Sequence, residues 1–193
     1  MERLDLLAVA LGLAALAGVN LYLTVFATGL AIHFHWITLA PRYQSLEVLG
    51  NPWIISIAGV LYSLEFFADK IPWVDSIWDA VHTVIRPIGG ALLAIQVLGH
   101  PSPVFTVIVA LLAGGTSLIA HTAKAATRLA TNTSPEPFTN IGLSLGEDAA
   151  VLGGLTLVYL SPLIALIIFL IAIGVAFIVV AKRRPTFPRR MSS

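Results

Sequence analysis

The residues that could do chemistry are ionisable groups placed inside strongly apolar stretches of the sequence. Glu65 and Asp69 are four residues apart, which puts two carboxylates on one face of a helix. Spacings of three and four residues align His121, Lys124 and Arg128 as one basic stripe. A charge in hydrocarbon costs about 2.5 to 3.5 kcal/mol on insertion scales, so we expect these groups to face a bundle interior or water.

Two more apolar stretches carry ionisable groups. Asp79, His82 and Arg86 repeat the three-and-four spacing, and Glu147 and Asp148 are adjacent. Histidine titrates near neutrality and closely spaced carboxylates resist full ionisation, so these groups are candidate proton carriers. The candidate residues for binding a ligand or ion are therefore Glu65, Asp69, Lys70, Asp79, His82, Arg86, Lys124, Arg128, Glu147 and Asp148.

The simplest arrangement of these charges is a network in which the acidic face of one helix meets the basic stripe of another. Such a network could be purely structural and lock the bundle in one arrangement. It could equally bind an ion or an anionic group, because proline-containing breaks at 69–75 and 132–137 would expose backbone N–H and C=O groups beside the charges. A third interpretation is that Lys70, Lys124 and Arg128 extend to the membrane interface.

The composition indicates an integral membrane protein. Of 193 residues, 58% are hydrophobic and 11% charged, whereas soluble domains have roughly 25% charged residues. The length suits one transmembrane domain over 1–181, followed by a basic cytoplasmic tail at 182–193. The sequence has no cysteine, which excludes disulfides, thiolate metal sites and cysteine nucleophiles.

Six apolar segments predict an all-α, polytopic helical membrane bundle of about six transmembrane helices. They cover residues 6–32, 52–68, 80–99, 104–126, 140–160 and 162–181. Asn20, in the middle of the first segment, is expected to hydrogen-bond to another helix. Aligning Ala58-Gly59 with Ala113-Gly114 places Asp69 opposite Lys124, and two broken hairpins then form a possible internal repeat, although an alanine- and glycine-rich chain also gives such a match by chance.

The basic residues predict the orientation, since cytoplasmic flanks are enriched in them. Six crossings place nine basic residues on one side, five of them in the tail, and only Arg42 on the other. Both termini are therefore expected to be cytoplasmic. The connection 33–50 would lie outside, with Trp36 and Tyr43 at the membrane interface.

No catalytic signature is present in the sequence. It has no phosphate-binding glycine loop, His-Glu-x-x-His helix or nucleophile elbow, so we expect neither an enzyme nor a cofactor. His33 and His35 could contact a transition metal, but no third ligand is evident nearby, and a metal stays unknown. The basic tail follows an apolar helix, which favours contact with anionic lipid over nucleic acid.

Four motifs together resemble a known family. They are Glu-Phe-Phe-Ala-Asp-Lys-Ile-Pro at 65–72, Trp-Asp-Ala-Val-His-Thr at 78–83, Ile-Arg-Pro at 85–87, and Asn-Thr-Ser-Pro-Glu-Pro-Phe-Thr-Asn at 132–140 followed by Glu147-Asp148. The chain resembles the bacterial integral-membrane family of unknown function DUF4126 over nearly its whole length. The resemblance implies a multi-pass protein of the bacterial inner (plasma) membrane and brings no activity with it.

These observations favour a small transporter or channel-like protein for a small ion or charged solute. Its site would lie between the two proline-broken hairpins. Its expected partners are membrane lipids, the ion or anionic solute, and a second copy of the chain. The alternative is a non-transporting membrane scaffold or assembly factor whose buried charges are structural. A lipid-modifying enzyme that uses the carboxylates with a metal is a third interpretation, without a motif to support it.

Overall fold

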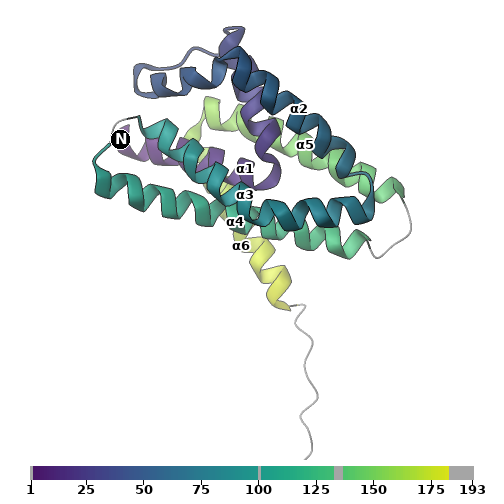
Figure 1. Ribbon diagram of the computed structural model, residues 1–193. Helices are drawn as coiled ribbons and strands as arrows, with labels where there is room; N and C mark the ends of the chain where they lie inside the picture. The colour runs from purple at the N-terminus through teal and green to yellow at the C-terminus, as the bar shows by residue number, and fades with distance from the viewer. Residues whose placement is uncertain (1, 100, 133–136, 183–193) are drawn as a thin grey trace, which may run out of the picture.

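The computed structural model describes residues 2–99, 101–132 and 137–182, and every regular element within these ranges is helical (Figure 1). The elements are α1 (Glu2–His33), the 3₁₀ helix η1 (Pro41–Gly50), α2 (Pro52–Ala68), α3 (Pro72–Leu98), α4 (Pro103–Asn132), α5 (Pro137–Leu160) and α6 (Pro162–Lys182). The all-helical architecture expected from the sequence is confirmed.

Helix α1 forms the centre of the molecule and packs against every other helix. Its small residues Ala8, Ala10, Ala14 and Ala17 are completely buried. At Gly18, a Cβ atom would overlap the Ser117 carbonyl oxygen of α4. Small residues allow helices in a membrane to approach closely, so this stripe explains how α1 fits between its neighbours.

Helix α1 is not continuous, because Asn20 leaves the helical conformation with φ −149° and ψ 99°. The Asn20 side-chain oxygen accepts a hydrogen bond from the Leu23 backbone N–H at 2.9 Å. Asn20 therefore caps the second half of α1. From the sequence alone, its amide is expected only to hydrogen-bond to another helix, whereas the residue also separates the two halves of α1. In Figure 1 the two halves run in different directions.

The break in α1 brings the start of the chain close to the segment that follows His33. Arg42 forms an ion pair with Asp5 at 3.5 Å, and Val9 lines the same cavity as Ile37. A straight helix would separate Val9 and Ile37 by about 40 Å at 1.5 Å per residue. The start of α1 and the 33–50 connection therefore lie close together, whereas the unbroken first helix expected from the sequence would separate them.

Fewer helices than the six expected meet the length and apolarity that a membrane crossing requires. Within the described residues, four helices are long and apolar enough to cross a bilayer, namely α1, α3, α4 and α5. The pair η1 and α2, bent by 65° at Asn51, makes a fifth candidate. Helix α6 counts as a shorter apolar helix over Pro162–Ala172, and its sequence stays apolar to residue 181. The tail beyond residue 182 lies outside the described residues.

Several boundaries differ from the sequence expectations. Helix α3 starts eight residues earlier than expected, so the break predicted at 69–75 shortens to residues 69–71. Pro72 occupies the first turn, where its missing N–H costs nothing, and Asp75 in that turn suits the positive end of the helix dipole. The break predicted at 132–137 falls largely on residues 133–136, outside the described residues.

Candidate functional site

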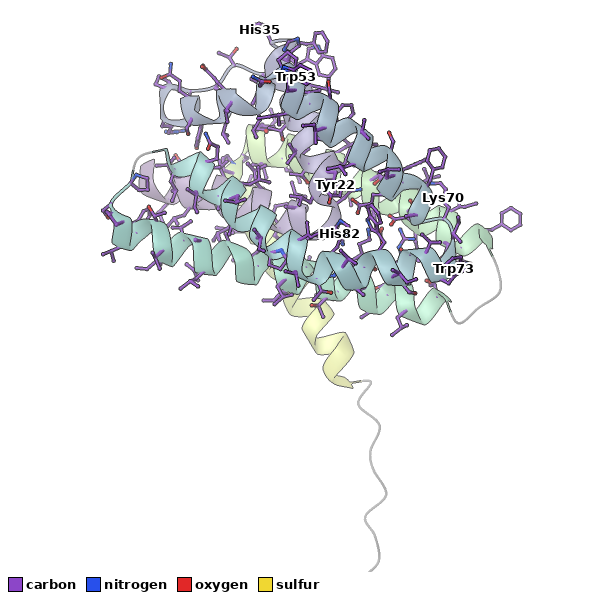
Figure 2. All side chains as sticks on the ribbon, in the orientation of Figure 1. Tyr22, His35, Trp53, Lys70, Trp73 and His82 are labelled. Carbon is purple, nitrogen blue, oxygen red and sulfur yellow. The ribbon has the colours of Figure 1, made fainter. Side chains whose placement is uncertain are left out.

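The charged cluster occupies the space between the end of α2, the first half of α3, the second half of α4 and the middle of α5. We use this name for Glu65, Asp69, Lys70, Asp75, Asp79, His82, Arg86, His121, Lys124, Arg128, Glu147 and Asp148. Most of these side chains are buried. Figure 2 shows nitrogen and oxygen atoms gathered around the labelled His82 and Lys70, between the ribbons of α2 and α3. All ten candidate residues from the sequence belong to this cluster.

Arg86 on α3 is completely buried and joins this helix to α1, α2 and α4. One Nη atom lies 2.5 Å from the Glu65 carboxylate of α2, and the other lies 3.6 Å from Asp79. Arg86 also donates a hydrogen bond to the Gly18 carbonyl oxygen of α1 at 3.3 Å. The guanidinium group therefore ties α2 to the carbonyl end of the first half of α1.

Lys124 on α4 lies among three carboxylates. Its Nζ atom is 3.5 Å from Glu65, 3.3 Å from Asp69 and 3.4 Å from Glu147. These distances exceed the roughly 2.7 to 2.9 Å of a strong charge-assisted hydrogen bond. The ammonium group is thus shared among the three acids and held tightly by none of them.

Arg128, one turn further along α4, is held much more closely. Its guanidinium group makes two hydrogen bonds to Glu147, at 3.0 and 2.5 Å, and another to Asp69 Oδ2 at 3.2 Å. It also donates to the Asp69 carbonyl oxygen at 2.8 Å. These contacts and those of Lys124 confirm that the acidic face of α2 meets the basic stripe of α4. The burial of both cations excludes their extension to the interface.

The two buried histidines have defined hydrogen-bond roles. His121 Nδ1 lies 2.6 Å from an Arg86 Nη atom, which can only donate, so this nitrogen accepts. The proton of His121 then sits on Nε2, 3.0 Å from the Asp79 carbonyl oxygen. His82 donates from Nδ1 to the Trp78 carbonyl oxygen at 2.7 Å and meets the Tyr22 hydroxyl at 3.0 Å. The geometry therefore fits a neutral imidazole at His121.

Asp148 has no cation within ion-pair distance among the described residues. Its two oxygens accept hydrogen bonds from the Asn20 amide at 3.1 Å and from the Tyr62 hydroxyl at 2.9 Å. Lys70, between α2 and α3, also lacks a carboxylate partner within the described ranges. Its Nζ atom donates to the Phe66 carbonyl oxygen at 2.8 Å and lies 3.0 Å from the centre of the Phe66 ring. Burial lowers the pKa of Lys70 from its ordinary value.

The cluster contains more acids than bases. Six carboxyl groups (Glu65, Asp69, Asp75, Asp79, Glu147 and Asp148) accompany four cationic side chains (Lys70, Arg86, Lys124 and Arg128). Full ionisation with neutral histidines would leave two excess negative charges in a largely buried volume. Glu65 Oε2 and Asp69 Oδ1 have no hydrogen-bond partner in the part of the chain that the structure describes. The cluster is thus suited to accept protons or small cations.

Two cavities reach the cluster from nearly opposite faces of α4. One of about 180 Å³ is lined by Asp75, Asp79 and Arg128, together with Thr83. The other, of about 340 Å³, lies among α1, α4, α5 and α6 and reaches Lys124 and Glu147 through apolar walls. The charged groups are therefore buried side chains that small solutes can approach from two directions.

Sequence reasoning missed one member of the charged cluster, Asp75, and two tyrosines that contact the cluster, Tyr62 and Tyr22. Asp75 was assigned to a break, whereas it lies 3.9 Å from Arg128 in the first turn of α3. Tyr62 lies three residues before Glu65, a spacing that places it on the same face of α2 and could have identified it. Tyr22 has no such local signal, because its contact with His82 joins residues from distant parts of the chain.

The described residues contain no group of three or more histidine, aspartate or glutamate side chains arranged to hold a metal ion. His33, one of the two histidines considered as metal ligands, instead lies 3.0 Å from the Gly50 carbonyl oxygen through its Nδ1 atom.

Comparison with known proteins identifies the family of the chain. No curated protein and no solved structure matches the chain. The model of a family described as Domain of unknown function (DUF4126) matches residues 7–182. Because this match covers most of the chain, the protein belongs to the DUF4126 family.

Proposed function

We propose that this membrane protein moves a small cation, the proton included, across the bilayer by way of the charged cluster. The observation that carries the proposal is the break of α1 at Asn20, which lies against the cluster. Transporters bind ions where discontinuous helices expose their ends inside the membrane. Both new ends of α1 meet a charged side chain in this protein.

The charges at the break match the helix dipoles. Arg86 donates to the Gly18 carbonyl oxygen, at the negative C-terminal end of the first half-helix. The Asp148 carboxylate accepts from Asn20, the residue that caps the positive N-terminal end of the second half-helix. A cation that neutralises Asp148 would therefore act directly on the residue that holds the break.

The charge balance favours a cation over an anion. The cluster has two more carboxyl groups than cationic side chains, and among the described residues Asp148 is held only by uncharged donors. A buried, uncompensated carboxylate is costly, so a proton or a metal cation is the natural counterion. Lys124, held at 3.3 to 3.5 Å by three acids, can shift when such a charge arrives.

Flux measurements in proteoliposomes test the proposal. With an imposed membrane potential, wild-type protein should carry H⁺, Na⁺ or K⁺ faster than protein-free vesicles. Asp148→Asn should reduce that flux at least tenfold, whereas Glu47→Gln, an exposed carboxylate on η1, should leave it unchanged. Absence of wild-type flux for all three ions would overturn the proposal.

A structural role is the second candidate, and it also has a specific observation in its favour. Arg86, Lys124 and Arg128 each contact at least two carboxylates, which is what a network that only locks helices requires. A scaffold of this kind would lose stability when a charge is removed and would show no ion flux in any variant.

For the cell, we propose the bacterial inner membrane, with the cluster end of the bundle toward the cytoplasm. Lys70 and the basic tail then lie on the cytoplasmic side, as the positive-inside rule favours. Helix α6 shows which end holds the N-terminus. Its first residue, Pro162, lines a cavity with Val9 of α1, whereas Ala172, further along α6, lines a cavity with Lys124 of the cluster. The start of α1 therefore lies at the end of the bundle away from the cluster. Reporter fusions at the two termini should therefore give opposite locations.

A further inference from the structure

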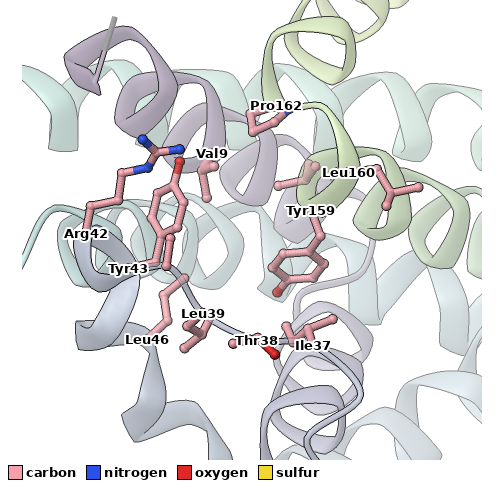
Figure 3. A pocket seen from close by; sticks show the side chains of 12 residues that line it. Val9, Ile37, Thr38, Leu39, Arg42, Tyr43, Leu46, Tyr159, Leu160 and Pro162 are labelled. Carbon is pink, nitrogen blue, oxygen red and sulfur yellow. The ribbon is translucent and has the colours of Figure 1, made fainter.

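A third cavity lies away from the charged cluster and has a different lining. It has a volume of about 380 Å³, within the roughly 300 to 1,000 Å³ of typical small-molecule sites. It is enclosed by the first half of α1, the segment 37–46 and the turn between α5 and α6. Figure 3 shows Arg42 and Tyr43 extending together along one wall, with Tyr159 and Leu160 across the cavity.

Most of the cavity wall is apolar, and two of its polar side chains, Arg42 and Tyr43, are neighbours on η1. Val9, Leu39, Leu46 and Val158 supply an aliphatic surface that suits an acyl chain. The Tyr43 hydroxyl is buried and has no hydrogen-bond partner among the described residues. An unpaired buried hydroxyl is costly, so this group indicates a missing acceptor.

Arg42 adds a cation beside this hydroxyl, and Asp5 adds an anion beside Arg42. The Arg42 guanidinium carbon lies 5.0 Å from the centre of the Tyr43 ring. One Nη atom lies 3.5 Å from Asp5, and a guanidinium group has five N–H donors, so donors remain for another acceptor. The Arg42 and Asp5 side chains are 40% and 25% exposed, so both are open to a ligand.

We propose that this cavity binds phosphatidylethanolamine. The phosphate would accept hydrogen bonds from Arg42 and Tyr43, the primary ammonium group would meet Asp5, and part of one acyl chain would fill the apolar wall. The adjacent cation and anion match a zwitterionic headgroup, whereas a purely anionic headgroup would face the Asp5 carboxylate without a compensating charge. This inference does not depend on the proposed transport activity.

Lipid binding to the purified full-length protein tests the proposal. Native mass spectrometry with phosphatidylethanolamine, phosphatidylcholine and phosphatidylglycerol would give the relative affinities. We expect phosphatidylethanolamine to bind tightest, because only its headgroup offers both a phosphate and an N–H donor. Equal affinity for all three lipids, or preference for phosphatidylglycerol, would overturn the assignment.

Three variants locate the binding site. Tyr43→Phe removes a single oxygen and should weaken phosphatidylethanolamine binding about tenfold, as expected for one hydrogen bond to a charged group. Asp5→Asn should abolish the preference over phosphatidylglycerol. Glu47→Gln, on the same 3₁₀ helix but outside the cavity lining, is the matched control and should bind like wild type. Wild-type binding by Tyr43→Phe would refute this site.

Discussion

Replacing Glu65 by glutamine should destabilise the protein strongly. Glu65 is completely buried, and one of its oxygens contacts both Arg86 at 2.5 Å and Lys124 at 3.5 Å. After the replacement, the nearest carboxylate to Arg86 is Asp79 at 3.6 Å. Removing one partner of a buried ion pair costs about 3 to 5 kcal/mol, and the longer contact with Asp79 compensates the charge of Arg86 only in part.

A double-mutant cycle measures how much of this loss belongs to the Glu65–Arg86 pair. Glu65→Gln, Arg86→Gln and the double variant would be unfolded by denaturant in detergent micelles. The double variant removes both charges of the pair, so neither is left buried without its partner. Its loss of unfolding free energy should therefore be smaller than the sum of the two single losses by at least about 1 kcal/mol. Glu147→Gln is a useful comparison. Its side chain is 15% exposed and Arg128 keeps Asp69, so we expect a smaller loss of about 1.5 kcal/mol.

Two results would refute this reasoning. If Glu65→Gln lowered the free energy of unfolding by less than about 1 kcal/mol, the remaining Arg86 charge would not carry the desolvation cost that its burial implies. If the two single losses were additive, Arg86 and Glu65 would act independently, and the cluster could not be described as one network.

Three further predictions concern the break in α1 and its partners. Asn20→Ala removes the cap on the Leu23 N–H and the hydrogen bond to Asp148, and should lower the free energy of unfolding by about 1 to 2 kcal/mol in the same denaturant assay. Gly18→Ala forces a methyl group against the Ser117 carbonyl and should cost about 1 to 3 kcal/mol, whereas Gly153→Ala, with open space around its Cβ position, should be close to neutral. Asp148→Asn can still accept from the Asn20 amide through its oxygen and can donate from its NH2 group to the Tyr62 hydroxyl oxygen, so it should remain folded by circular dichroism, and loss of cation flux in this variant reports on function; extensive unfolding would contradict that expectation.

The pairing of α2 with α4 could be predicted because it depends on local spacing. Residues three and four apart share a helix face, so the positions of Glu65, Asp69, Lys124 and Arg128 already define one acidic and one basic face. An acidic and a basic helix face in hydrocarbon can neutralise their charges by packing against each other, and few other partners are available there. The start and end of α2 were also predictable, since Asn51 caps the helix before Pro52 and apolar residues fill the rest.

The break in α1 could not be predicted in the same way. A single asparagine in an apolar stretch is compatible with an unbroken helix whose amide bonds to a neighbour. What stabilises the break is contact with Asp148 and Arg86, which are distant in sequence and reach Asn20 and Gly18 only in the folded bundle. The 3₁₀ helix η1 was missed for a related reason. Its ten residues follow no apolar periodicity, and it is held by contacts such as that between Ser45 and the Gln96 carbonyl oxygen.

Structural and transport roles fall on different members of the charged cluster. Arg86 and Arg128 are held at 2.5 Å by Glu65 and Glu147, and they fix α2, α3, α4 and α5 relative to one another. Lys124 and Asp148 are held loosely or by uncharged donors, and each lies beside one of these rigid pairs. A rigid frame around a lysine shared by three acids and a carboxylate without a cation partner among the described residues is the arrangement that lets a cation enter without unfolding the bundle. Variants of the arginines should therefore lose stability first, whereas variants of Asp148 should lose flux first.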